Sequence, residues 1–478
     1  MKILMINPPF MPKYSRQSRS PCVTKGGTFY YPYYLAYATG VLDKGGYDVK
    51  LVDAIANEWN KEETMKFIKE FKPDLYVSDT SIPSFKNDVE FASRVKSEVG
   101  CKVCLVGAHR MDMREAFRLS DKIDFVCRGE YDYTVRDLVE ALESGKDLGN
   151  VLGLSYRKGN KIINNKDRPP IENLDEIPFV SWVYKKHFGK DGIKKYFYAS
   201  LRWPQVTILT ARGCPYNCSF CPIPFKGSYR SRSPENVLEE FKYIKEELPF
   251  VKEVMLEDDT FPVVKSRTLK ISELLIKNRV KLKWSCNARV NTDYETLKKM
   301  KEAGCRLMCV GFETPTQKVL DNIHKGTTEN MQFKFMKDTK KLGMLVNGCF
   351  ILGLPGDDKE SIQRTIEFAK RLNCDTAQFY PLMVYPGTEA YDWAKRNGYL
   401  ETEDYTKLLD DNGQHSTILK LPNFTSKDLV NLCYKARKEY YLRWNYILYK
   451  IWQGIKSPEE AIRTLKSAKV FFKHLKSD

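Results

Sequence analysis

The sequence predicts an α/β protein with two series of alternating strands and helices, followed by a helical extension. Short apolar runs alternate with helix-like runs over the first 140 residues, and a second alternating series begins near residue 199. Beyond about residue 393 the pattern becomes mainly helical. We therefore expect a first domain at 1–145, a linker at 146–198, a second domain at 199–392 and a basic helical region at 393–478.

The first series contains five strand-like runs, separated by spacers long enough for crossover helices. These runs are 2–6, 47–52, 74–78, 102–107 and 124–127, with a helix-like stretch at 35–42. Such alternation is typical of a parallel sheet wound on both sides, of Rossmann or flavodoxin type. No G-x-G-x-x-G sequence follows the first run, so a dinucleotide site is not predicted.

The second series contains six strand-like runs with helix-like stretches between them. These runs lie near 205–210, 252–257, 282–287, 306–312, 345–352 and 376–381. Six strand–helix units in a row predict a partial (β/α)6 barrel, closed or partly open. The segment 146–198 has little periodicity and is rich in Gly, Pro, Asn and Lys, so we expect a linker with a few short strands.

The amino-acid composition indicates which partners and which cellular compartment to expect. The 478 residues include 78 Lys and Arg against 61 Asp and Glu, a net charge of +17, which favours acidic partners such as phosphate groups, nucleic acid or an anionic membrane. No secretory signal is recognised and no apolar run is long enough to span a membrane. Thirteen cysteines in such a chain indicate a reducing cytoplasm, with metal or catalytic use for some of them.

The last part of the chain is basic and aromatic. Residues 431–478 hold eleven Lys and Arg, four Asp and Glu and nine aromatic residues. The favoured interpretation is a cap helix with a solvated basic face. The alternative is peripheral contact with the inner face of a membrane, because a helix of this composition can lie on an anionic bilayer.

Three closely spaced cysteines follow the first strand of the second series. Cys214, Cys218 and Cys221 form a C-x3-C-x2-C sequence, and the nearest other cysteines, Cys127 and Cys286, are far away in the chain. Thiolates are the ligands of iron–sulfur clusters, so this loop predicts a 4Fe–4S cluster with one iron left open. A zinc site would need a fourth ligand, and a loop with this Gly and Pro content suits three unligated core cysteines poorly.

The spacing of the cysteines, with Phe220 before the third, resembles the signature of the radical S-adenosylmethionine (SAM) superfamily. This resemblance implies that SAM chelates the open iron and is cleaved to a 5′-deoxyadenosyl radical that abstracts a hydrogen atom. It also implies that Phe220 lies near the SAM adenine, and that reduced flavodoxin or ferredoxin donates the electron.

Further segments between residues 200 and 390 are similar to the same superfamily, and the resemblance implies a SAM-binding role for each. The residues are Glu257, Asp258 and Asp259 after the second strand, Arg289 after the third, Glu313 at the end of the fourth and Gly353 after the fifth. The alternative for each is an ordinary turn or helix cap, since acidic residues and glycines are common at strand ends.

The first 140 residues resemble the cobalamin-binding domain that precedes many radical SAM cores. The matching residues are Gly107 and His109 after the fourth strand and Gly129 and Glu130 after the fifth. The D-x-H-x-x-G sequence that supplies an imidazole to cobalt is missing, so cobalamin is expected to bind without a protein imidazole. The alternative is a domain that only shapes a substrate cavity.

Three reactions are compatible with this domain order. The leading expectation is rearrangement or cyclisation of a small-molecule or lipid-linked sugar substrate, because residues 30–37 and 227–234 resemble hopanoid-associated ring-contraction and calditol-synthase-type enzymes. The second is cobalamin-dependent methylation of an unactivated carbon or of phosphorus. The third, RNA modification, lacks a recognisable RNA-binding element, so nucleic acid is not expected. Arg230 and Arg232 are candidates to clamp a phosphate or carboxylate, or else are solvated surface residues.

Overall fold

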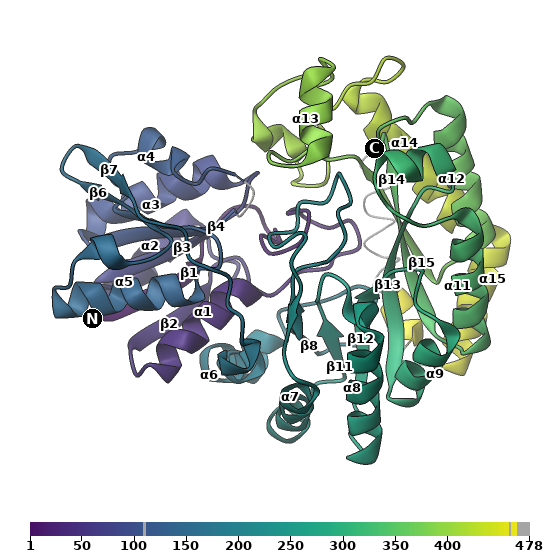
Figure 1. The fold of residues 1–478 in the computed structure, drawn as a ribbon, viewed down its shortest axis with the longest axis horizontal. Helices are drawn as coiled ribbons and strands as arrows, with labels where there is room; N and C mark the ends of the chain where they lie inside the picture. Colours follow the sequence, from purple (N-terminus) through teal and green to yellow (C-terminus); the bar gives the residue numbers. More distant parts are fainter. Residues whose placement is uncertain (109–110, 458–459, 466–478) are drawn as a thin grey trace. The chain divides into compact units, whose positions relative to one another are not determined.

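The computed structural model describes every residue except 109–110, 458–459 and 466–478. The chain divides into two compact units (Figure 1). The first unit comprises Met1–Val23 and Phe29–Tyr196, and the second comprises Thr24–Thr28 and the chain from Phe197 onward. A short piece of the N-terminal chain is therefore built into the second unit.

The first unit is a doubly wound sheet of strand order β2-β1-β3-β4-β5-β6-β7, in which β1 to β5 are parallel. The strands are β1 Lys2–Asn7, β2 Asp48–Asp53, β3 Leu75–Thr80, β4 Lys102–Gly107, β5 Phe125–Cys127, β6 Leu154–Lys158 and β7 Lys161–Asn164. The helices are α1 Tyr33–Lys44, α2 Lys61–Phe71, α3 Phe85–Val99, α4 Glu115–Leu119, α5 Asp132–Ser144 and α6 Val180–Ile193, with 3-10 turns at Leu148–Asn150 and Leu174–Glu176. The order 2-1-3-4-5 is the flavodoxin-type arrangement, so the prediction for this part is confirmed.

Continuous apolar runs explain why the central strands are parallel and buried. Ile3, Leu4, Met5 and Ile6 of β1 are all fully buried, as expected for a strand that is covered by helices on both faces. Helix α1 contacts α5 and α6, and helix α3 contacts α2 and α4, so the helices form two sets. The two sets cover the two faces, and the carboxyl ends of the parallel strands share one edge.

The linker expected over 146–198 is structurally part of the first unit. Strands β6 and β7 form an antiparallel hairpin, and β6 pairs antiparallel with β5. Only Gly159 and Asn160 separate the two strands, which is a recognised hairpin signal. The hairpin covers the edge that the short strand β5 would otherwise expose.

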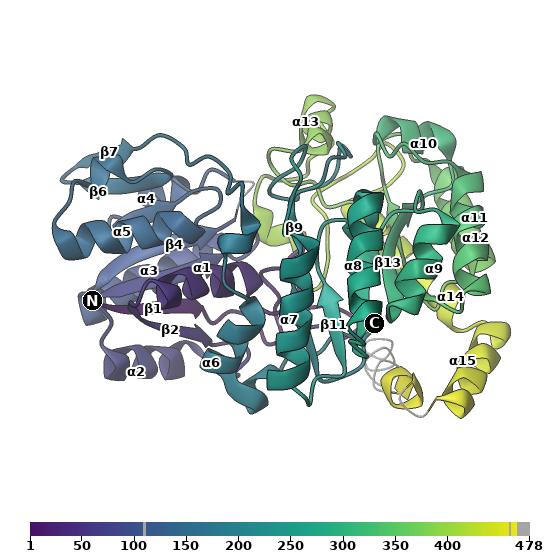
Figure 2. The same cartoon turned by 60° about the horizontal axis from the view of Figure 1, so that its bottom comes forward.

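The second unit is a six-stranded parallel sheet with helices on its outer face (Figures 1 and 2). Its strands, in the order β15-β14-β13-β12-β11-β8, are Thr376–Pro381, Leu345–Leu352, Cys305–Glu313, Lys283–Ala288, Glu253–Leu256 and Gln205–Ile208. Its helices are α7 Pro234–Glu247, α8 Lys265–Lys277, α9 Tyr294–Glu302, α10 Gln317–Asn322, α11 Glu329–Lys341 and α12 Lys359–Leu372, with a 3-10 turn at Phe261–Val263. In the described chain no pairing joins β8 to β15, so the predicted partial barrel is confirmed as an open one.

Along the barrel strands, side chains point alternately into the hydrophobic core and into the interior of the open barrel. Phe350 of β14 stacks between Phe312 of β13 and Phe379 of β15, with ring centres 5.7 and 5.3 Å away. The intervening positions, including Cys349 and Gln378, are half-buried because they face the interior of the open barrel. The hydrophobic core therefore lies between the strands and the outer helices.

The described C-terminal region contains three helices and a further helical stretch at 460–465. The helices are α13 Glu389–Arg396, α14 Ser426–Tyr441 and α15 Trp444–Lys456, with a 3-10 turn at Tyr405–Leu408. Residues 397–425 form an irregular connection with isolated bridges such as Leu400–Leu419, so the continuous helical character expected from 393 onward is only partly present. Gly398, Gly413 and Pro422 explain the interruption, because these residues disfavour a helix interior. Among the residues described, none of the helices has the length and apolarity needed to cross a membrane.

Candidate active site

The three cysteines lie in a loop that hydrogen bonds close on itself. The loop runs between two short antiparallel strands, β9 Ala211–Arg212 and β10 Arg230–Ser231. The Gly227 amide donates to the Cys214 carbonyl at 2.8 Å, and the Cys221 amide donates to the Cys218 carbonyl at 3.2 Å. The Ser219 amide donates to the carbonyl of Ile323 at 3.0 Å, which ties the loop to the end of α10. Cys214 and Cys218 are buried and Cys221 is half-buried.

Gly213 is the residue that lets this loop form. Its φ of +85° is a left-handed conformation that favours glycine, and a Cβ at this position would overlap the carbonyl oxygen of Ser228. The glycine therefore allows the two arms of the loop to approach each other beside Cys214.

The chemistry of the donor set fits an iron–sulfur cluster. Burial, with a further contribution from Asp259, raises the pKa of the Cys214 thiol, so a bound metal is needed to keep this sulfur as a thiolate. Within the described ranges, no three His, Cys, Asp or Glu side chains converge as ligands of a single metal ion. Three cysteines that bind three different irons of a cube do not need to converge on one point.

Arg289 is the cation next to the cysteine loop. It follows β12, is buried, and its Nη1 lies 3.5 Å from the Cys218 sulfur. Its guanidinium lies 3.7 Å from the centre of the Tyr216 ring, and its Nη2 donates to the carbonyl of Lys325. Its Nε has no hydrogen-bond partner in the described structure. A buried guanidinium with a free N–H next to the loop is suited to bind a carboxylate, which is the role predicted for Arg289.

Glu313 and Lys325 form a buried ion pair in the same region. Lys325 Nζ lies 2.6 Å from Glu313 Oε1, and both side chains are buried. Glu313 has a φ of +65°, an uncommon conformation for a residue other than glycine. Lys325 thus links the two residues. Its ammonium group donates to Glu313, and its carbonyl accepts a hydrogen bond from Arg289. Sequence analysis missed Lys325 because it lies between α10 and α11 and belongs to none of the recognised motifs.

The three acidic residues after β11, Glu257, Asp258 and Asp259, have different environments. Asp258 accepts hydrogen bonds from the Thr210 amide, the Thr210 hydroxyl and the Ala211 amide, and burial raises its pKa. Both of its oxygens therefore hold the chain that leads into the cysteine loop, and a contact of Asp258 with SAM stays a prediction. Glu257 is buried beside it, and Asp259 is half-buried.

Gly353 is positioned by a neighbouring carboxylate. The amides of Gly353 and Leu354 donate to Asp357 Oδ2 at 3.0 and 2.9 Å, and burial raises the pKa of Asp357 to about 6. Gly353 has a φ of +89°, which explains the glycine. Phe220 is half-buried in the cysteine loop, and its position near the adenine stays a prediction.

Arg232 is a structural residue. Its guanidinium pairs with Glu240 and donates to Asn236 Oδ1 at 2.7 Å and to the Leu209 carbonyl at 3.1 Å. Both expectations for Arg232, a clamp for a phosphate or carboxylate ligand and surface solvation, are therefore wrong, because its buried N–H groups are bound to protein partners. Ser233 caps α7 as its sequence predicts. Arg230 is half-buried, with its guanidinium 5.3 Å from the Phe225 ring.

In the first unit, the predicted glycines lie at the carboxyl edge of the sheet. Gly107 and Gly129 have φ values of +91° and +66°, and a Cβ at Gly129 would meet open space. The buried Glu130 carboxylate accepts a hydrogen bond from the Ile171 amide at 2.7 Å, so it holds that segment in place. His109 lies outside the described residues.

The place after β1 is occupied by a buried ion pair. Arg16 and Asp88 are fully buried and lie 2.6 Å apart, and Arg16 Nη1 also donates to Asn7 Oδ1 at 2.8 Å. His187, the one described histidine of this unit, accepts from the Leu51 amide and lies 2.8 Å from Asp43. Within the described part of this unit, His187 is therefore held by protein partners, and cobalamin binding without a protein imidazole stays a prediction.

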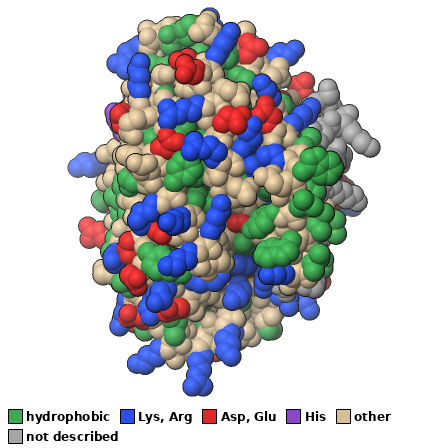
Figure 3. Space-filling view, turned by 90° about the vertical axis from the view of Figure 1, so that its right-hand side faces the viewer, with side chains coloured by type: hydrophobic (Ala, Val, Ile, Leu, Met, Phe, Trp, Pro, Cys, Tyr) green, Lys and Arg blue, Asp and Glu red, His purple; other side chains and the backbone are tan. Residues whose placement is uncertain are grey.

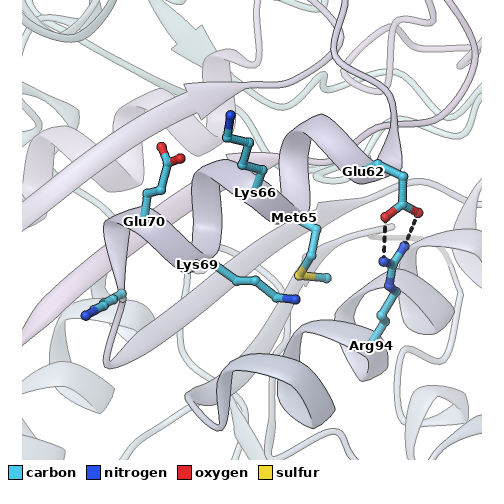
Figure 4. Close-up of a pocket in the computed structure, with 7 residues that line it drawn as sticks. Glu62, Met65, Lys66, Lys69, Glu70 and Arg94 are labelled. Carbon is cyan, nitrogen blue, oxygen red and sulfur yellow. Dashed lines mark hydrogen bonds and ion pairs between the residues drawn. The ribbon is translucent and has the colours of Figure 1, made fainter.

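A separate hollow lies on the surface of the first unit beside α2 and α3 (Figure 4). It measures about 550 Å³, and its lining is Glu62, Met65, Lys66, Lys69, Glu70, Lys72 and Arg94. Glu62 and Arg94 pair across two hydrogen bonds of 2.6 and 2.7 Å. The lining includes none of the residues predicted to bind a cofactor, so this hollow is not our candidate site.

The cysteine loop, the buried guanidinium beside it and the open parallel barrel define a radical SAM enzyme, and the chain belongs to the radical SAM superfamily. The family model of the radical SAM superfamily matches residues 208–369. An uncharacterized methyltransferase of Pyrococcus horikoshii is 33% identical over 465 residues, which cover 95% of each chain. Membership implies a 4Fe–4S cluster and SAM as cofactors.

Two further proteins are similar to this one over most of its chain. The anaerobic magnesium-protoporphyrin IX monomethyl ester cyclase of Rubrivivax gelatinosus is 28% identical over 75% of this chain and 65% of its own length. The structure of the radical SAM methyltransferase TsrM of Kitasatospora setae, with cobalamin and a 4Fe–4S cluster bound, has a TM-score of 0.66 at 16% identity and covers 87% of this chain and 83% of that chain. This second likeness establishes the shared fold of the two-unit chain and confirms the predicted α/β class.

Proposed function

We propose that this protein is a cobalamin-dependent radical SAM methyltransferase that acts on an unactivated carbon or on phosphorus. The observation that carries the proposal is the similarity to the methyltransferase of Pyrococcus horikoshii, which extends through both units and not only through the radical SAM core. Cyclisation of a lipid-linked sugar, the leading expectation from the sequence, receives no comparable support. The methyl-transfer alternative is therefore the better hypothesis.

Each unit has a task in this proposal. Cys214, Cys218 and Cys221 hold three irons, and Arg289 orients the SAM carboxylate with its free N–H. Gly107 and Gly129 border the corrin in this proposal. When bound, the cluster supplies the electron that cleaves SAM, and cobalamin carries the methyl group. Reduced flavodoxin or ferredoxin is the proposed electron donor.

Product analysis separates methyl transfer from rearrangement. Anaerobically reconstituted protein is incubated with SAM, a reductant, hydroxocobalamin and a cell extract that supplies the substrate, and the products are measured by mass spectrometry. Methyl transfer predicts S-adenosylhomocysteine and 5′-deoxyadenosine in comparable amounts. 5′-Deoxyadenosine with little S-adenosylhomocysteine would instead support rearrangement and contradict the proposal.

Corrin retention tests the first unit independently of turnover. Protein that has been mixed with hydroxocobalamin and desalted should keep the corrin, which is visible in its absorbance spectrum. The triple variant with Ala at positions 214, 218 and 221 should lose the iron–sulfur absorbance and still retain the corrin. If the unmodified protein retains no corrin, the cobalamin-dependent reaction is excluded.

A further inference from the structure

Helix α15 attaches to the second unit through a polar inner face. Tyr446 donates to the Asp375 carbonyl at 2.8 Å, and Tyr449 and Gln453 donate to Asp375 Oδ1 at 2.8 and 2.9 Å. Lys450 lies on the same face, is buried, and donates to Gln453 at 2.9 Å. The spacing of these four residues, i, i+3, i+4 and i+7, places them on one side of the helix, against the start of β15.

The opposite face of α15 is apolar and directed away from the protein. Its side chains are between 52% and 79% exposed and belong to Trp444, Leu448, Ile451, Trp452 and Ile455. The exposed Ile462 and Leu465 follow just beyond the helix. Hydrophobic side chains also gather on the face shown in Figure 3, with Lys and Arg at their margins. An amphipathic helix ordinarily buries its apolar face, so this reversed orientation indicates that the apolar face has a partner.

Charge identifies an anionic partner. Helix α15 contains no Asp or Glu, and Lys456 Nζ lies 3.8 Å from the Trp452 ring, at the border of the apolar face. Lys435 and Lys438 on α14 are exposed, and residues 431–478 hold eleven Lys and Arg against four Asp and Glu. A second copy on this face would bring two sets of cations together, which disfavours self-association. An anionic surface would neutralise them.

We propose that the apolar face of α15, formed by Trp444, Leu448, Ile451, Trp452 and Ile455, docks this protein onto an anionic lipid surface. At 1.5 Å per residue the 13-residue helix is roughly 20 Å long, too short to cross a bilayer, so it lies in the interface. Trp444 and Trp452 sit at the headgroup level, and the flanking lysines contact lipid phosphates. This contact does not depend on the reaction that the enzyme catalyses.

Vesicle binding tests the proposal with the full-length protein. Co-sedimentation is measured with phosphatidylcholine vesicles that contain or lack phosphatidylglycerol. The protein is expected to bind the anionic vesicles and to be released by salt. The double variant Leu448→Ser with Ile455→Ser should bind roughly ten-fold more weakly, because it loses apolar surface from the helix. A matched control, Leu119→Ser with Ile276→Ser, removes two exposed apolar side chains elsewhere and should bind normally.

A second measurement reports on the helix directly. Tryptophan fluorescence should be quenched by brominated phosphatidylcholine in anionic vesicles, and Trp444→Phe with Trp452→Phe should remove this quenching. No vesicle binding by the unmodified protein, equal binding by the Ser variant, or quenching unchanged in the Phe variant would overturn the proposal. It would also be overturned if light scattering showed a dimer that the Ser variant converts to a monomer, since the face would then bind a second copy.

Discussion

The guanidinium of Arg289 lies over the ring of Tyr216, with its central carbon 3.7 Å from the ring centre. Tyr216 belongs to the cysteine loop, and its hydroxyl accepts a hydrogen bond from Asn291 at 2.8 Å, two residues after Arg289. The stacking and the bond from Nη2 to the Lys325 carbonyl fix the plane of the guanidinium and leave Nε free. The cation is therefore held in one orientation before any ligand binds.

Replacing Arg289 with Lys should weaken SAM binding while the cluster stays intact. Lysine keeps the charge but has neither the planar stack nor the forked donors, so the loss should be roughly ten-fold, close to one hydrogen bond to a charged group. Equilibrium dialysis of SAM against the anaerobic protein measures the loss, and iron–sulfur absorbance monitors the cluster. The exposed Arg118→Lys serves as the control. Unchanged SAM affinity would remove Arg289 from the binding site.

Glu313 and Lys325 should show strong energetic coupling. Changing Glu313 to Gln leaves a buried ammonium group without its partner, and Lys325→Met leaves a buried carboxylate, so each single variant should lose about 3 kcal/mol of unfolding free energy. The double variant should lose much less than the sum, because neither charge remains. Urea unfolding of the four proteins gives the coupling energy. Additive losses would show that the two side chains do not depend on each other.

The fold could largely be predicted from the sequence because its strongest signals are local. Buried runs such as Ile3–Ile6 identify parallel strands, and the Ser233-Pro234 pair locates the start of α7. The place of 154–164 in the first sheet was not predicted, because strand pairing between segments far apart leaves no periodic signal. The reversed orientation of α15 was also unpredictable, since the hydrophobic pattern of a helix does not reveal which face meets the protein.

The site was predictable only where one short segment carries it. The three cysteines share a single loop, so their spacing was informative. Lys325 enters the site because α10 brings it beside Arg289, and this juxtaposition exists only in three dimensions. For Arg232 the residue type suggested a ligand contact, while its long side chain reaches inward to Glu240. A charged residue close to a motif is thus ambiguous until its partners are known.

Asp79→Asn should make the protein more stable at neutral and alkaline pH. Asp79 is fully buried at the end of β3, accepts a hydrogen bond from Gln17, and burial raises its pKa to about 7. The folded state therefore holds a proton that the unfolded state releases near pH 4, so the stability present at low pH is lost as the pH rises towards 7. At about 1.4 kcal/mol per pKa unit, the total effect is a few kcal/mol.

The difference between two unfolding curves measures this effect, because the contributions of other carboxyl groups cancel. Urea unfolding of the unmodified protein and of Asp79→Asn is followed from pH 4 to pH 8. The two free energies of unfolding should diverge as the pH rises, with the variant more stable at pH 8. Asp121→Asn, at an exposed carboxylate, should show no such divergence. Parallel curves for Asp79→Asn would show that Asp79 is ionised in the folded protein throughout this range.

Gly213→Ala should abolish cluster assembly, whereas Gly227→Ala should not. Both glycines lie in the left-handed region, at φ +85° and +79°, so alanine adds about 1–2 kcal/mol of backbone strain at either position. Only at position 213 would the Cβ overlap a backbone carbonyl, that of Ser228; at 227 its nearest neighbour is Asn217 Oδ1, 3.5 Å away. The alanine at 213 therefore forces apart the arms of the loop beside Cys214. Iron and sulfide content after anaerobic reconstitution gives the answer, and a normal cluster in Gly213→Ala would show that this close approach is not needed to bind it.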